Sequence, residues 1–173
     1  LLGAPGSGRS RLLDELRDAA RADGAQVIAL PAAAEARPGL GLDTLAGALL
    51  ARLQRDPMLA VRARLRIESD LPALRWRFAG FARAFPGPLS PTEPKAELIM
   101  GALLSALGDP DRPALITQDD ADRIDATTLA ALAAWQRQRE SRASHTLVVL
   151  VAEDSEASRA ALARLQGPQY TLP

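Results

Sequence analysis

The sequence predicts a three-layer α/β fold, in which helices cover both faces of a parallel sheet of about five strands. Three observations support this prediction. Short apolar runs alternate with longer stretches in which leucine and alanine recur at helical spacing. A glycine-rich turn separates Leu1-Leu2 from the first helical stretch. The chain has 173 residues, of which 47% are hydrophobic, so it can build one core and one domain.

The expected elements follow one another as strand and helix along most of the chain. Helices are predicted from the glycine-rich turn to about Ala22, and over residues 42–54, 57–67, 71–85, 93–107, 126–139 and 155–165. Strands are predicted over residues 26–30, 114–116 and 146–151, with a further strand starting near residue 170. Residues 31–41 read as a loop and the proline-rich residues 86–91 as a breaker.

The glycine-rich turn has the spacing of a phosphate-binding loop, G-x-x-x-x-G-x-S, with arginine at the usual lysine position. Glycines let the backbone adopt positive φ and bring its N–H groups close to phosphate oxygens. The cation of Arg9 would neutralise the β- and γ-phosphates, and the Ser10 hydroxyl would bind Mg²⁺. The residues expected to bind the nucleotide are Gly3, Ala4, Pro5, Gly6, Ser7, Gly8, Arg9, Ser10 and Arg11. The alternative is an ordinary turn before a helix.

The arginine at position 9 leaves the chemistry of the loop open. Lys95 is the single lysine among 21 basic residues, so a coding bias toward arginine explains Arg9 as a drifted lysine. Arginine is nevertheless a planar fork that takes more space inside a loop than a lysine does. Nucleotide binding with slow or no hydrolysis is therefore an alternative to hydrolysis.

A second group of candidate residues follows the predicted strand at residues 114–116. The apolar run ends in Asp119 and Asp120, and ligands of parallel sheets bind at the carboxyl ends of strands. The two carboxylates are expected beside the phosphate loop if their strand is the neighbour of the first strand. Asp119 would then hold the metal through water together with Ser10, and Asp120 would be the catalytic group that orients the attacking water. The alternative is a solvated turn.

These residues also resemble a known family. The pattern Asp119-Asp120-Ala121-x-x-x-Asp125, followed by Thr128-Leu129-x-x-Leu132, is similar to the second nucleotide motif of AAA-type ATPases. The resemblance is to the STAND-like ATPases of large LuxR-type transcriptional regulators, whose opening loop is also similar. It implies a P-loop NTPase fold, ATP and Mg²⁺ as cofactors, and a switch module whose nucleotide state controls oligomerisation or exposure of an effector domain.

The chain departs from this family pattern at three places. Arg9 replaces the loop lysine, Ile124 replaces an aromatic residue, and Glu153-Asp154 follow the strand that in the family leads to a polar or basic sensor of the γ-phosphate. Two further functions therefore stay open. One is a scaffold for protein interaction that does not hydrolyse ATP, and the other is a phosphotransferase with the arginines of residues 62–83 in a lid.

Composition excludes several other functions. The absence of cysteine excludes disulfides, thiol catalysis and thiolate metal sites, and zero net charge gives no basic footprint for nucleic acid. No apolar run is long enough for a membrane span, and no signal peptide is evident, so a soluble cytoplasmic protein is expected. Residues 1–173 are expected to be one AAA-type domain cut from a longer multidomain protein. Its expected partners are nucleotide and other domains of the same polypeptide; self-association is left open.

Overall fold

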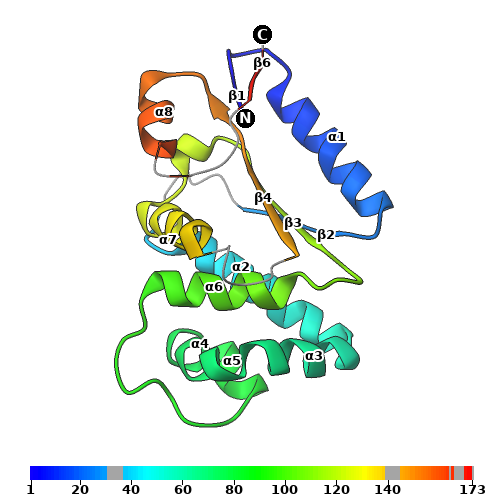
Figure 1. Ribbon diagram of the computed structural model, residues 1–173, viewed down its shortest axis with the longest axis vertical. Coiled ribbons are helices and arrows are strands. Elements are labelled where there is room, and N and C mark those ends of the chain that lie inside the picture. The colour runs from blue at the N-terminus through cyan, green and yellow to red at the C-terminus, as the bar shows by residue number, and fades with distance from the viewer. Residues whose placement is uncertain (31–36, 139–144, 164, 166–169, 173) are drawn as a thin grey trace.

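The computed structural model describes residues 1–30, 37–138, 145–163, 165 and 170–172. The helices and 3-10 turns are α1 (Arg9–Ala22), α2 (Leu40–Arg55), α3 (Pro57–Ile67), η1 (Glu68–Asp70), α4 (Leu71–Arg77), α5 (Ala79–Ala84), α6 (Ala96–Leu107), η2 (Ala121–Arg123), α7 (Ala126–Gln138) and α8 (Glu156–Leu162). The strands are β1 (Leu2–Gly3), β2 (Gln26–Ala29), β3 (Ala114–Gln118), β4 (Thr146–Leu150), β5 (Ala152–Glu153) and β6 (Thr171–Leu172). Figure 1 shows these elements.

All paired strands run parallel, and the six strands occupy five positions side by side because two of them lie in one line. β2, β3 and β4 pair in one sheet, and β5, β1 and β6 pair in another. Only Val151 separates β4 from β5, and its N–H donates to the carbonyl of Gln118 at 2.8 Å, so β5 continues the line of β4. The order of positions across the sheet is therefore β2, β3, then β4 and β5 together in one position, then β1 and β6. This confirms the predicted α/β fold with a parallel sheet of about five strands.

Helices cover both faces of the sheet, as Figure 1 shows for α1 on one side and α2, α6 and α7 on the other. The alternation along β3 explains this arrangement. Ala114 and Ile116 belong to the main core, together with α2, α6 and α7. Thr117 points to the opposite face, where its hydroxyl accepts a hydrogen bond from Arg17 Nε of α1 at 2.9 Å.

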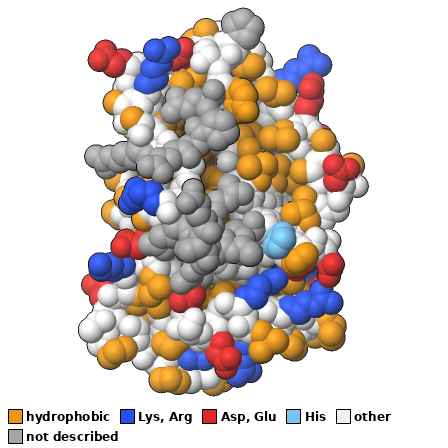
Figure 2. Space-filling view, viewed as in Figure 1, with side chains coloured by type: hydrophobic (Ala, Val, Ile, Leu, Met, Phe, Trp, Pro, Cys, Tyr) orange, Lys and Arg blue, Asp and Glu red, His pale blue; other side chains and the backbone are white. Residues whose placement is uncertain are grey.

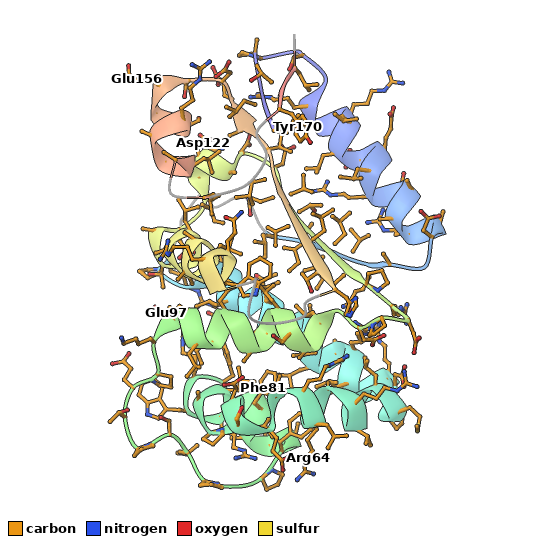
Figure 3. The ribbon with its side chains drawn as sticks, viewed as in Figure 1. Arg64, Phe81, Glu97, Asp122, Glu156 and Tyr170 are labelled. Carbon is orange, nitrogen blue, oxygen red and sulfur yellow. The ribbon has the colours of Figure 1, made fainter. Side chains whose placement is uncertain are left out.

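The segment from α3 to α5 adds a further helical layer outside α2 and α6. Its buried side chains belong to the same core as those of α2 and α6. Figure 3 shows Phe81 inside this layer and Arg64 on its outer edge. Phe81 is fully buried. In Figure 1 this layer lies at the lower end of the view, and the passage from β1 into α1 lies at the upper end.

The single helix predicted over residues 71–85 is wrong, because the chain breaks at Phe78. Phe78 has φ −128° and ψ 111°, an extended conformation that separates α4 from α5. The break lets α5 approach α2 closely at Gly80, where a Cβ atom would lie 2.5 Å from Cδ1 of Leu50. Apolar residues continue at helical spacing through the break, so periodicity could not locate it.

Other boundaries differ from the prediction by a few residues. α2 begins at Leu40, two residues before its predicted start, and α6 begins at Ala96 rather than at residue 93. α8 ends at Leu162, before the predicted end at residue 165. The strand predicted over residues 146–151 is β4, which ends at Leu150, and the short strand β5 that follows Val151 was not predicted. Residues 31–36 of the predicted loop and residue 139 of a predicted helix lie outside the described residues.

An apolar cavity of about 760 Å³ lies between α1, α7 and β4. Its lining side chains are aliphatic or aromatic apart from Gln136, and include Leu12, Leu16, Trp135 and Leu147. Figure 2 shows hydrophobic side chains gathered over α1 and β4. Such walls do not suit a triphosphate, so the candidate site lies elsewhere. None of the described helices is long and apolar enough to cross a membrane.

Candidate functional site

The glycine-rich loop links β1 to α1 and leaves open space above its backbone. Gly6 and Gly8 have φ of 79° and 81°, which only glycine adopts at low cost. A Cβ atom added at either position would meet nothing within 4 Å. Gly8 is also the N-cap of α1. The loop therefore presents its backbone at the positive end of a helix, which is the arrangement that binds phosphate.

Arg9 folds back across this loop. Its Nη1 donates to the carbonyl of Gly3 at 2.7 Å, so the side chain joins the first residue of α1 to the last residue of β1, where the loop starts. Gly3 permits this close packing, because a Cβ atom there would lie 2.6 Å from Ser7 Oγ and 3.2 Å from Arg9 Cγ. A guanidinium has five N–H donors, so the contact with Gly3 leaves other donors available to a ligand.

The hydroxyl groups of the loop differ in their surroundings. Ser7 Oγ is buried, and none of the residues that the structure describes gives it a hydrogen-bond partner. Ser10, the predicted metal ligand, is exposed in the first turn of α1. Arg11 pairs with Glu15 one turn further along the helix, at 2.9 Å. A buried hydroxyl without a partner and an exposed one beside it fit a loop that holds an oxygen-rich ligand.

Asp119 and Asp120 were expected beside the loop if their strand neighboured the first strand, and this condition is not met. β5 pairs with β1, and its continuation β4 pairs with β3, so one strand lies between the loop and the carboxylates. Two strand spacings correspond to about 9.5 Å. Sequence order could not show that the strand formed by residues 146–153 is inserted between the two earlier ones. The two carboxylates still lie at the carboxyl end of β3, the same edge of the sheet as the loop.

Asp119 and Asp120 make few contacts with the rest of the protein. Asp119 Oδ1 accepts from the N–H of Asp120 at 3.1 Å. Asp120 Oδ2 lies 4.0 Å from Arg123 Nη1, and both of these side chains are half exposed. Asp120 has φ 50° and ψ 53°, the only described non-glycine residue with positive φ. Backbone strain of this kind is typical of functional positions.

Asp125 has a structural role that the sequence analysis did not predict. Its carboxylate is buried and accepts from the N–H groups of Gly39 (2.8 Å), Thr128 (2.9 Å) and Gly41 (3.4 Å) and from the Thr128 hydroxyl (2.7 Å). Burial acts to raise the pKa of Asp125, but these hydrogen bonds outweigh it and the pKa is lowered. Asp125 thus joins the start of α2 to the start of α7. The sequence held one signal for this structural role, because an aspartate immediately before a predicted helix commonly accepts hydrogen bonds from the first N–H groups of that helix.

Two acidic residues lie at the carboxyl end of β5: Glu153 is its last residue and Asp154 follows it. The N–H of Asp154 donates to the carbonyl of Gly3 at 3.0 Å, which places Asp154 beside the loop. Both of its carboxylate oxygens accept hydrogen bonds from Arg159, at 2.6 and 2.8 Å. These hydrogen bonds lower the pKa of Asp154. Glu153 is exposed.

Among the described residues, no group of three or more acidic, histidine or cysteine side chains could hold a metal ion by itself. Magnesium does not require such a group, since it commonly keeps several waters and shares one or two protein ligands with substrate phosphates. The exposed Ser10 hydroxyl and the half-buried Asp119 carboxylate are suitable ligands of this kind.

The chain matches the model of the AAA ATPase domain family over residues 1–150. The matched range contains the glycine-rich loop, Asp119, Asp120 and Asp125, and ends before β5. No curated protein and no solved structure matches the chain.

Proposed function

Because the chain belongs to the AAA ATPase domain family, we propose that this nucleotide-binding module is an ATP-dependent switch in a larger regulatory protein of the STAND-like, LuxR type. The observation that carries the proposal is the open loop at the start of α1. Gly6 and Gly8 hold the backbone in a conformation that suits phosphate oxygens, with free space above it. The nucleotide would control contacts with other domains of the polypeptide or with further copies of the chain.

The chain offers a defined set of ligands to ATP and Mg²⁺. Residues 3–11 would surround the phosphates and, apart from Pro5, could donate backbone N–H groups to them, with Arg9 as the cation. Ser10 would bind the metal directly, and Asp119 would reach it through water, because its strand lies two spacings from β1. Bound MgATP would supply a terminal phosphate that can be transferred to water.

Asp120 is the candidate for hydrolysis. It would accept a proton from the water and orient it, since its carboxylate is half exposed and its ion pair with Arg123, at 4.0 Å, is long. A specific observation favours the alternative function, a scaffold without turnover. Arg9 already donates to Gly3, and a planar guanidinium takes more space in such a loop than the compact ammonium of a lysine.

The test is calorimetric titration of the chain with MgATP, compared with matched variants. Gly8→Ala strains the backbone of the loop, whereas Gly24→Ala introduces the same strain at φ 81° beyond the end of α1. Asp119→Asn removes the proposed metal ligand, and Asp122→Asn changes an exposed aspartate nearby. Binding is expected in the micromolar range, weakened at least tenfold by Gly8→Ala and Asp119→Asn and unchanged in the two controls. No binding by the unaltered chain at millimolar MgATP would refute the proposal.

The variant Arg9→Lys distinguishes an ATP-hydrolysing switch from a scaffold that does not hydrolyse ATP. If the arginine is a drifted lysine, the substitution restores a compact cation and increases the rate of phosphate release. If the domain is a scaffold, the variant binds MgATP and releases no phosphate above background. The Asp120→Asn variant of Arg9→Lys is the control, because a true increase in hydrolysis requires the catalytic carboxylate.

A further inference from the structure

The outer face of α3 carries apolar side chains that the fold leaves in water. The inner face packs against α2 and α6 through three buried side chains, those of Leu59, Ala63 and Ile67. Met58, Val61 and Leu65 lie on the opposite side of the helix, and they are 66%, 57% and 70% exposed. α3 is therefore apolar on two opposite faces, of which the core uses only one.

The exposed residues of α3 have the spacing of a seam between two packed helices. Val61 follows Met58 by three positions, and Leu65 follows Val61 by four. Apolar residues alternate in this way, by three and by four, along the contact line of paired helices. A second helix lying along α3 could therefore cover all three side chains at once. An extended strand repeats every two residues and would not match this spacing.

Arginine stands on both sides of the seam. Arg62 and Arg64 occupy the two flanking positions at which paired helices meet charged residues of their partner. Arg64 is exposed, at the outer edge of the helical layer in Figure 3, and no described residue forms an ion pair with it. Arg62 pairs with Asp111 at 2.9 Å, but the two side chains are 53% and 77% exposed, so this surface pair contributes little. α3 itself contains no acidic residue.

These charges restrict what can cover the seam. Two copies of α3 placed face to face would bring arginine against arginine, and like charges at these positions oppose pairing. Helices that lie on a membrane surface have a broad apolar face, commonly with tryptophan or phenylalanine. The seam of α3 is one residue wide and contains no aromatic residue. A helix with acidic residues beside its own apolar seam is complementary to it in both shape and charge.

We propose that the outer face of α3 binds an acidic amphipathic helix of a partner protein. Apolar residues of that helix would cover Met58, Val61 and Leu65, and its glutamate or aspartate side chains would pair with Arg62 and Arg64. This surface is separate from the nucleotide site, since Figure 1 shows α3 at the end of the molecule opposite to β1. The helical layer outside α2 and α6 thus gains a function in protein interaction.

The test uses two synthetic peptides of about three heptads, both with leucine at the apolar positions. One peptide has glutamate at the flanking positions and the other has lysine, so neither pairs readily with itself. The full chain should bind the glutamate peptide with a Kd below about 100 µM, measured by fluorescence anisotropy. It should bind the lysine peptide at least about tenfold more weakly, because arginine and lysine repel each other.

Substitutions in the seam should remove this binding. Leu65→Gln should weaken binding of the glutamate peptide about tenfold or more, since it places a polar group at the centre of the contact. Leu89→Gln is the matched control, because Leu89 is 56% exposed and lies outside α3. It should leave the affinity unchanged. Circular dichroism confirms that each variant is folded.

Charge reversal tests the role of the two arginines. The double variant Arg62→Glu with Arg64→Glu should exchange the preference, so that the chain binds the lysine peptide and no longer the glutamate peptide. The control is Arg11→Glu with Arg21→Glu, which reverses two exposed arginines on α1 and gives the same net charge. This control should keep the preference of the unaltered chain, which separates a local contact from an effect of total charge.

Three results would overturn the proposal. The first is that the folded chain binds neither peptide, or binds both equally. The second is cosedimentation with phosphatidylglycerol vesicles that Leu65→Gln abolishes, without peptide binding, which would assign the face to a lipid surface. The third is self-association in analytical ultracentrifugation that Leu65→Gln abolishes, which would assign the face to a second copy of the chain. The nucleotide titrations are independent of all three.

Discussion

Three of the four aspartates in residues 119–125, namely Asp119, Asp120 and Asp125, have very different surroundings. Asp125 is buried, and its carboxylate accepts four hydrogen bonds from Gly39, Gly41 and Thr128. Asp119 and Asp120 are half-buried, and their carboxylates have few partners among the described residues. The comparison shows that one acidic motif holds two kinds of residue, one that stabilises the fold and two that are available to a ligand.

The difference arises from what lies opposite each side chain. Asp125 faces the start of α2, whose first N–H groups lack partners within their own helix. Asp119 and Asp120 follow the carboxyl end of β3, where Asp119 accepts from the N–H of Asp120 and the Asp120 carboxylate lies 4.0 Å from Arg123. The free energy of the fold should therefore depend on Asp125, and the affinity for ligands on Asp119 and Asp120. The following predictions test this division, from the largest effect to the smallest.

Asp125→Ala should lower the free energy of unfolding by about 3 kcal/mol, because it leaves buried N–H groups and a hydroxyl without an acceptor. Asp119→Ala should change it by less than about 0.5 kcal/mol, as expected for a partly exposed site. Urea unfolding followed by circular dichroism measures both. Equal losses in the two variants would contradict the division between a structural and an available aspartate.

Gly41→Ala should destabilise the protein by about 2 kcal/mol through overpacking. A Cβ atom at Gly41 would lie 2.5 Å from Cγ2 of Thr128, in the same region that Asp125 holds together. Gly47→Ala on the same helix is the control, since nothing lies within 4 Å of its added Cβ, and alanine there should stabilise α2 by about 0.5 kcal/mol. Thermal unfolding of both variants would show opposite signs; a loss in both would contradict the packing argument.

The stability of the protein should fall at acid pH in a way that depends on Asp125. Its pKa is lowered in the folded state, so the carboxylate contributes stability above the pKa of an unfolded aspartate, about 3.9. This contribution is lost as the pH falls through the lower folded value. Urea midpoints measured between pH 7 and pH 3 should therefore decline less steeply in Asp125→Asn than in the unaltered chain. A parallel decline would show that other carboxylates dominate.

Asp120→Gly should raise the free energy of unfolding by about 0.5 kcal/mol, because glycine adopts the left-handed conformation at φ 50° without cost. The same change should abolish any ATP hydrolysis. Asp122→Gly is the comparison, since Asp122 lies in η2 with ordinary backbone geometry and glycine should destabilise it by a similar amount. Destabilisation by Asp120→Gly would mean that the Asp120 side chain stabilises the loop.

Local patterns in the sequence predicted the fold well. Helical spacing of leucine and alanine located α1, α2, α3, α6 and α7 within a few residues, because each buries one face against the sheet or another helix. The spacing of glycine and serine located the loop, which has backbone conformations suited to that role. The break at Phe78 was missed, since it depends on the approach of α5 to α2 rather than on local propensity.

Non-local features of the candidate site could not be predicted. The insertion of β4 and β5 between β1 and β3 depends on pairing between distant segments, which leaves no local signal. The contacts of Asp125 with Gly39 and of Asp154 with Arg159 likewise require the folded chain. The predicted roles of residues 3–11, Asp119 and Asp120 remain predictions that the proposed titrations test.

The position of β1 has a consequence for how the protein folds. Leu2 pairs with Ala152 and with Thr171, so both neighbours of β1 come from the last part of the chain. Such contacts of high sequence separation form late, because they carry the largest cost in loop-closure entropy. The helices between residues 40 and 107 can pack earlier through more local contacts. The glycine-rich loop should therefore be ordered last, and ligand binding during refolding should report completion of the sheet rather than formation of the core.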